Sequence, residues 1–236
     1  LKFRMKILPN LLATPTPSSV GETDPYFASV SLLLHMDGAN AGTSFVDSSS
    51  NGLAITANGN VVTSTAQSKF GGASALFDGT TDSLTTPTNA VFTLDGDFTI
   101  EFWCYINTLK QSGILANGAS SFSGTAVVIV LDHSTHNDRF GIWNFPSLNG
   151  VLCTTPTVVT GQWYHVAFVR SGTTLTPYLN GVASTSATTS ATFSFSTTNL
   201  RVGRYWGGDF AGYLDDLRIT KGVARTIVVP TQAYPS

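Results

Sequence analysis

The chain has 236 residues, enough to bury one sizeable core, and an all-β sandwich of this length is commonly a single domain. Charged residues make up 11% of it and the formal net charge is -2, so it has no basic footprint for DNA or RNA. No apolar run reaches the roughly 18 residues of a membrane-spanning helix. The composition therefore argues against nucleic-acid binding and a membrane span, and it predicts an uncharged surface of Ser, Thr, Asn and Gly.

The first 25 residues hold four of the ten prolines and are predicted to form an extended arm, because proline fixes φ and disfavours helix in its predecessor. The arm begins with basic residues and resembles a signal peptide, but Pro9 and Asn10 interrupt its apolar stretch, so no cleavage is expected. We expect the arm to bind a neighbouring subunit in a homo-oligomer, with folding back onto its own domain as the alternative. Its apolar anchors are Phe3, Ile7, Leu8, Leu11 and Leu12.

Residues 26–236 are predicted to form one β-sandwich, because short alternating or apolar runs recur there between turn signals. No window has helical periodicity. Residues 97–106 carry large apolar groups at both odd and even positions, which predicts a central strand, and Asn180-Gly181 predicts a tight hairpin turn. The two cysteines, Cys104 and Cys153, are expected to be buried thiols. The predicted strands are 28–36, 73–77, 97–107, 124–132, 139–145, 161–170, 174–180, 199–204 and 211–220, and the predicted buried residues include Phe102, Trp103, Phe168 and Leu217.

Six sequence motifs follow one another along residues 32–225. They are LLLHMDG (32–38), FVDSSSNG (45–52), KFGGASALFDGTTDSL (69–84), DFTIEFWCYI (97–106), WYHVAFVRSGTTLTPYLNG (163–181) and GYLDDLRITKGVAR (212–225). In this order they resemble the laminin-G-like, concanavalin A-like jelly-roll family, which implies an all-β, two-sheet antiparallel sandwich over residues 26–235. The opening SLLLHMDG, LDDLRITKGVAR and the closing PTQAYP are also similar to domains in structural proteins of tailed bacteriophages. The chain departs from that pattern after Arg225, where Thr226 replaces the usual aromatic residue.

Catalysis is not expected. A glycosidase of this fold needs two carboxylates a few ångströms apart, and the chain has only two glutamates, Glu22 in the arm and Glu101. We interpret Glu101 as a polar residue on an outward or rim position. No nucleophile elbow, phosphate-binding loop or dinucleotide motif occurs.

A metal site, if present, is expected to hold calcium, which many laminin-G-like domains bind through several oxygen ligands. The resemblance brings the loop with Asp37 and Asp47 near Asp215. The sequence leaves open an equal alternative, in which the first two are turn residues and Asp215 pairs with Arg201 or Arg218. Zinc at His133 and His136 is the weaker hypothesis, because the same loop also suits a solvated hairpin.

Ligand binding is predicted at the aromatic segments Tyr205-Trp206 and Trp143, with Asp209 beside them, because such side chains stack on and hydrogen-bond to a sugar. The alternative is that both tryptophan side chains fold back and cover the hydrophobic core. Together these features predict a non-enzymatic bacteriophage virion structural protein, either a capsid decoration, a head-fibre or a tail-associated protein. Its arm is expected to bind neighbouring virion subunits, and its sandwich can contact host-surface glycans. The alternative is a secreted bacterial lectin-like module, and a glycan hydrolase is the third reading.

Overall fold

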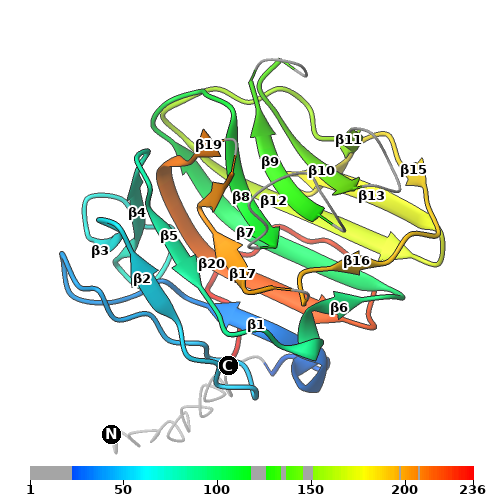
Figure 1. Cartoon of the computed structure of the whole chain (residues 1–236), viewed down its shortest axis with the longest axis horizontal. Helices are drawn as coiled ribbons and strands as arrows, with labels where there is room; N and C mark the ends of the chain where they lie inside the picture. The colour runs from blue at the N-terminus through cyan, green and yellow to red at the C-terminus, as the bar shows by residue number, and fades with distance from the viewer. Residues whose placement is uncertain (1–22, 118–125, 134–136, 146–150, 197, 207) are drawn as a thin grey trace, which may run out of the picture.

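The computed structural model describes residues 23–117, 126–133, 137–145, 151–196, 198–206 and 208–236. Two antiparallel sheets are stacked face to face in these residues (Figure 1). No α-helix occurs among the described residues, which contain only the single 3-10 turns η1 (Phe27–Ser29) and η2 (Ala90–Phe92). The expected all-β sandwich is confirmed, and the predicted arm residues Phe3, Ile7, Leu8, Leu11 and Leu12 lie outside the described part of the chain.

The larger sheet has nine strands in the order β14-β13-β12-β7-β20-β4-β3, with β1 paired to β20 and β15 paired to β13. Strand β7 lies in the middle, as its two apolar faces predict. The strands are β1 (Val30–Leu34), β3 (Val62–Ser64), β4 (Ser74–Asp78), β7 (Phe98–Ile106), β12 (Trp163–Ser171), β13 (Thr174–Leu179), β14 (Val182–Ala183), β15 (Ala187–Thr188) and β20 (Ala211–Lys221).

The smaller sheet has seven strands in the order β11-β10-β9-β8-β17-β5-β2, and two short two-stranded ladders accompany it. The seven are β2 (Thr56–Asn58), β5 (Ser83–Thr85), β8 (Ser112–Asn117), β9 (Ala126–Asp132), β10 (Arg139–Phe145), β11 (Val151–Thr154) and β17 (Leu200–Val202). The ladders pair β6 (Thr93–Leu94) with β16 (Phe193–Ser194), and β18 (Arg204–Tyr205) with β19 (Gly208–Asp209).

The core fills the space between the sheets with alternate residues of each strand. Phe102 of β7 meets Phe140 of β10 edge to face at 5.9 Å, which joins the two layers. All four residues predicted to be buried are buried, and both cysteines are buried free thiols. Every predicted strand is present, and the hairpin at Asn180-Gly181 has positive φ at both residues (50° and 78°), as a tight turn of this kind requires.

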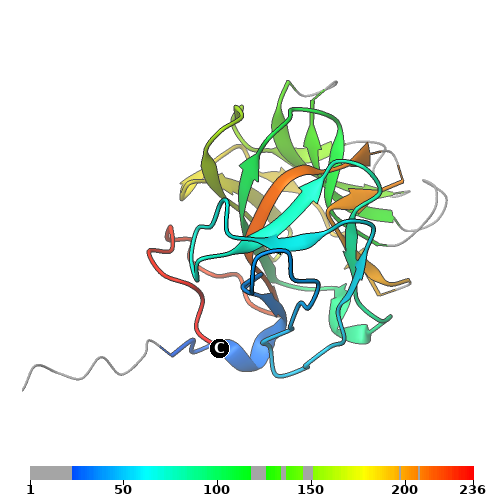
Figure 2. The same cartoon turned by 90° about the vertical axis from the view of Figure 1, so that its left-hand side faces the viewer.

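The C-terminal segment, residues 222–236, leaves β20 and returns across the outer face of the nine-stranded sheet (Figure 2). Its Tyr234 is buried, and the Tyr234 backbone N–H donates to Asp216 Oδ2 at 2.8 Å. The motifs LDDLRITKGVAR and PTQAYP therefore contact each other in the folded chain. The chain's own C-terminal segment therefore covers part of one outer face of the sandwich.

Candidate functional site

A hairpin made by β18 and β19 lies across β8 on the outer face of the seven-stranded sheet. Two glycines allow this close approach, because side chains at either position would meet the opposing backbone. A Cβ on Gly113 would lie 2.6 Å from Tyr205 N, and one on Gly208 would lie 2.0 Å from Gln111 O. The hairpin is therefore seated directly on the sheet, where it presents Tyr205 and Trp206.

Three aromatic side chains from this hairpin and from β10 form a cluster that we call the aromatic platform: Trp143, Tyr205 and Trp206. Tyr205 packs on the small outward side chains Ala116, Val128 and Val130. Its ring meets Trp143 at 6.4 Å and Trp206 at 5.1 Å, both edge to face. Tyr205 is buried, whereas the two tryptophans are half-buried and keep part of their surface in solvent.

Polar groups border the aromatic platform. Arg204 Nε lies 2.8 Å from Asp209 Oδ1, and Arg204 also donates to the Thr81 carbonyl at 3.2 Å. Burial raises the pKa of Tyr205, although a hydrogen bond with Gln111 opposes the rise. The phenol therefore stays neutral at physiological pH. The four residues predicted to bind ligand, Trp143, Tyr205, Trp206 and Asp209, are thus brought together by the hairpin and β10.

A second set of aromatic residues, which the sequence analysis did not single out, lies on the opposite outer face of the sandwich. Trp163, Tyr105 and Tyr213 occupy one row across β12, β7 and β20, with ring separations of 5.6 and 5.9 Å. All three are half-buried. Their alternation with the core residues of the same strands is the signal that could have identified them.

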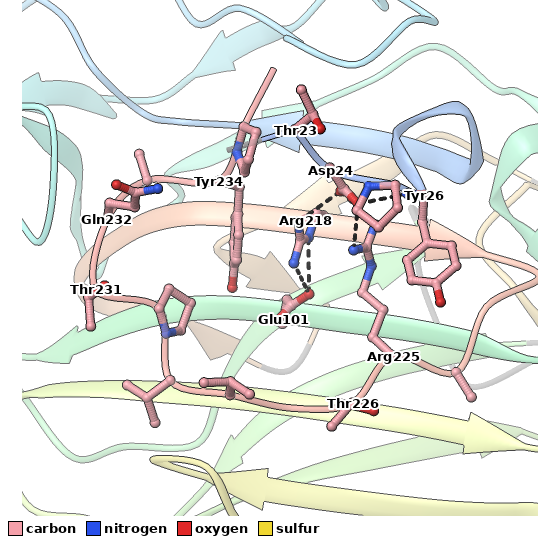
Figure 3. A pocket seen from close by; sticks show the side chains of 17 residues that line it. Thr23, Asp24, Tyr26, Glu101, Arg218, Arg225, Thr226, Thr231, Gln232 and Tyr234 are labelled. Carbon is pink, nitrogen blue, oxygen red and sulfur yellow. Dashed lines mark hydrogen bonds and ion pairs between the residues drawn. The ribbon is translucent and has the colours of Figure 1, made fainter. Parts of the chain in front are cut away.

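The C-terminal segment and residues 23–26 border an open cavity of about 480 Å³ on the nine-stranded sheet (Figure 3). Four charged side chains line it in a chain of ion pairs. Arg218 donates to Glu101 at 2.7 and 3.0 Å and to Asp24 at 3.0 Å, and Arg225 donates to Asp24 at 2.7 and 2.9 Å. The Arg218 guanidinium also lies 3.7 Å from the centre of the Tyr234 ring. We call this the charged clamp, because it joins residues from both ends of the described chain to β7 and β20.

Both acids of the charged clamp are held in the ionised form. Burial by itself would raise the pKa of Glu101, but a hydrogen bond from His165 and the Arg218 charge outweigh it and leave the pKa below its usual value. Burial would also raise the pKa of Asp24, but the hydrogen bonds and charge of Arg225 outweigh burial, so the pKa of Asp24 is lowered as well. Glu101 lies on the outward side of its strand, which is one of the two expected positions, but it is only 3% exposed and therefore does not lie at a solvent-exposed rim. Asp24, which the sequence assigns to the arm, is tied to the sandwich.

The three aspartates predicted as calcium ligands are not arranged as an oxygen cage. Asp47 is buried and accepts from the backbone N–H groups of Leu33, Ser49 and Leu53, so both its oxygens cap its own loop. Asp215 Oδ2 accepts from the backbone of the segment at Lys69 instead, at 2.7 Å. In the described part of the chain, no group of three His, Cys, Asp or Glu side chains could hold a metal ion.

Asp215 and Asp37 do share one acidic neighbourhood. Burial raises the pKa of Asp215 to about 7, against the hydrogen bonds from Lys69 and Phe70, and the charges of Asp216 and Asp37 add to the rise. Neither of the alternative pairings of Asp215, with Arg201 or with Arg218, occurs among the described residues, where Arg218 pairs with Glu101 and Asp24. His133, from the weaker zinc hypothesis, hydrogen-bonds Asp138, and His136 lies outside the described residues.

No helix in the described part of the chain is long and apolar enough to cross a membrane. One similar solved structure is domain 4 of AbnA, a GH43 extracellular arabinanase from Geobacillus stearothermophilus, in complex with arabinotriose. The two structures superpose with a TM-score of 0.66 and 21% sequence identity, and the match covers 84% of this chain and 95% of that domain. The binding domain of botulinum neurotoxin serotype D is similar at a TM-score of 0.61 and 13% identity, over 86% of this chain.

A Trypanosoma rangeli sialidase mutant displaying trans-sialidase activity matches at a TM-score of 0.57 and 13% identity, over 82% of this chain. The match spans 49% of the neurotoxin chain and 31% of the sialidase chain. These likenesses concern the fold alone. No curated protein sequence matches the chain. A family model described as the concanavalin A-like lectin/glucanases superfamily matches residues 78–226, more than half of the sequence, and the chain belongs to that family.

Proposed function

We propose that this chain is a non-catalytic carbohydrate-binding module whose ligand stacks on the aromatic platform. The observation that carries the proposal is the meeting of Trp143, Tyr205 and Trp206 on the outer face of the seven-stranded sheet, beside the ion-paired Arg204 and Asp209. Aromatic rings offer an apolar face to the C–H groups of a sugar, and neighbouring charged groups bind its hydroxyls. The arabinotriose complex of the similar arabinanase domain supports this class of ligand.

Catalysis by the charged clamp is disfavoured by its protonation state. A glycosidase needs one carboxyl group that is protonated near neutral pH and can donate to the leaving group. The pKa of Glu101 and that of Asp24 are both lowered, and both carboxylates are bound by Arg218. We therefore expect any bound oligosaccharide to be recovered intact after long incubation, which chromatography of the mixture would test.

Binding is tested on a glycan array, followed by calorimetry with the best oligosaccharide. Trp206→Ala and Trp143→Ala should each weaken binding roughly tenfold or more, since truncated aromatic anchors commonly lose that much. Tyr213→Ala is the matched control, because it removes a half-buried aromatic residue from the other outer face. Full binding by both tryptophan variants, with unchanged unfolding temperatures, would remove the platform from the proposal.

We also propose that the module is carried on a bacteriophage particle as a capsid decoration, head-fibre or tail-associated protein, in a homo-oligomer. The support is the similarity of SLLLHMDG, LDDLRITKGVAR and PTQAYP to segments of tailed-phage structural proteins. A secreted bacterial lectin-like module remains the alternative, and the fold suits both. Mass spectrometry of purified particles and of culture medium separates them, because the first requires the chain to co-purify with particles and the second to be found free in the medium.

A further inference from the structure

On the same face as the aromatic platform lies an arginine, Arg201, that forms no ion pair with any acid in the described part of the chain. Arg201 of β17 points outward, opposite Ala116 of β8 on one side and Thr85 of β5 on the other. Ala116 is one of the residues on which Tyr205 packs, so Arg201 borders the platform. Arg201 is half-buried, and its Nε is buried without a hydrogen-bond partner among the described residues.

The surrounding charges do not satisfy Arg201. A second guanidinium, that of Arg204, lies near enough to lower the pKa of Arg201 further, after burial, which is the larger cause. Asp209 is the acid whose charge opposes this shift, and it already forms the ion pair with Arg204. Arg139 on the same face also has a buried Nε without a partner, but it stands opposite Asp132 in the pairing of β9 and β10. Arg201 has no such neighbour across its strands.

A buried guanidinium donor costs free energy unless an acceptor reaches it, and an anionic acceptor fits best. The planar fork of arginine matches a carboxylate through two parallel hydrogen bonds. The row that contains Arg201 continues across β8 and β9 through Ala116 and Val128 to Trp143. Tyr205 covers Ala116 and Val128 in this row, so a saccharide lying over the aromatic platform would extend from Trp143 toward Arg201.

We propose that the ligand of this site is an acidic saccharide and that Arg201 binds its carboxylate. The inference rests on the proposed carbohydrate-binding function and specifies the class of sugar. Arg201 acts here as the residue that selects charge, whereas the aromatic platform supplies contact area that is independent of charge. The two contributions are separable by experiment.

The test compares each saccharide with its uncharged counterpart. Oligogalacturonate, hyaluronan oligosaccharides and oligosialic acid are titrated into the full chain by calorimetry, each beside its carboxyl-reduced form, with dextran sulfate as the sulfate arm. We expect at least one acidic oligosaccharide to bind and its carboxyl-reduced form to bind roughly 10- to 100-fold more weakly. Dextran sulfate binding at equal or higher affinity, with no preference for carboxylates, would overturn the carboxylate assignment.

Two substitutions assign the charge selection to one residue. Arg201→Met should remove the preference for the acidic form and leave affinity for the carboxyl-reduced form unchanged, and Arg201→Lys should restore only part of the preference, because an ammonium lacks the fork. Trp206→Ala should weaken both forms equally. If the natural chain binds neutral sugars as well as acidic ones, the inference about Arg201 fails while the proposed function stands. If it binds no saccharide at all, the proposed function fails.

Discussion

Replacing Arg218 by methionine tests the charged clamp, because Arg218 is its central member. The side chain makes three hydrogen bonds of 2.7 to 3.0 Å to two carboxylates. Methionine keeps much of the apolar stem and removes the charge. Asp24 would keep Arg225, but Glu101, at 3% exposed, would keep only the Tyr234 hydroxyl and His165, whose Nε2 lies 3.5 Å away. Removing one partner of a buried pair typically costs about 3 to 5 kcal/mol, and we expect a loss in that range at pH 7.

The loss should depend on pH with a defined sign. The pKa of Glu101 in the folded chain is lower than the ordinary value of 4.5, so its ionised form contributes stability above about pH 4.5, and this contribution disappears as the pH falls through the lower folded value. Without Arg218, one of the causes that lower this pKa is gone while burial still raises it. The difference in unfolding free energy between the natural chain and Arg218→Met should therefore be largest at neutral pH and shrink below pH 4.5.

Urea unfolding followed by tryptophan fluorescence at pH 7 and at pH 4 measures both quantities, provided that the slopes with denaturant agree. Arg204→Met is the matched control. It breaks an ion pair whose members are 35% and 24% exposed, and pairs of this kind contribute about 0 to 1 kcal/mol. A loss in Arg218→Met as small as that of the control, or one that is equal at the two pH values, would refute the assignment of Arg218 and Glu101 as a stabilising buried pair.

Three further outcomes are expected. Phe168→Ala should lower the free energy of unfolding by about 3 to 5 kcal/mol in urea titrations, because Phe168 is fully buried between the sheets. Asp47→Asn should lower the free energy of unfolding by about 1 to 3 kcal/mol, because an amide nitrogen would face a backbone donor. Chelation with EDTA should leave the unfolding temperature of the natural chain unchanged, and a drop that calcium restores would revive the calcium hypothesis. The pKa of Asp215 is raised to about 7, so its protonated form contributes stability that is fully present below the unfolded value of 3.8 and is lost as the pH rises through 7. Asp215→Asn should therefore gain stability relative to the natural chain above pH 7. Urea unfolding of both chains at pH 5 and pH 8 measures this difference.

The long strands could be predicted because their apolar residues alternate or run together. Residues 97–106 show both faces of β7, and its central place follows from that pattern. Most strands that were not predicted are only two to four residues long, as are β2 and β5, and so short a segment offers too few positions for an alternation to be recognised. Strand β8 was not predicted for a different reason. A register shift between Gly113 and Leu115 breaks the period of two on which such a prediction depends.

The site was predictable only in part, because its contacts cross the sheets. The aromatic segments stood out beside Gly and Asp, but the packing of Trp143 on Tyr205 depends on how β10 lies beside the hairpin. The charged clamp joins Asp24 to Arg218 from opposite ends of the chain, and no local pattern contains that pair. Asp47 has the composition of a calcium ligand, and only the folded loop reveals that backbone N–H groups occupy its oxygens.

The two outer faces of the sandwich meet the same physical requirement in different ways. A charge withdrawn from water must find a partner. On the nine-stranded sheet the chain provides the partners itself, since the clamp neutralises Arg218 with Glu101 and Asp24 and the C-terminal segment covers them. On the seven-stranded sheet Arg204 forms an ion pair with Asp209, while Arg201 forms none with a described residue and is left with the charge of that same Asp209. A partner for Arg201 must then come from solvent or from a bound molecule, and an acidic sugar on the aromatic platform would provide it. This asymmetry is why we propose that recognition takes place on the seven-stranded face and that the charged clamp on the nine-stranded face serves stability.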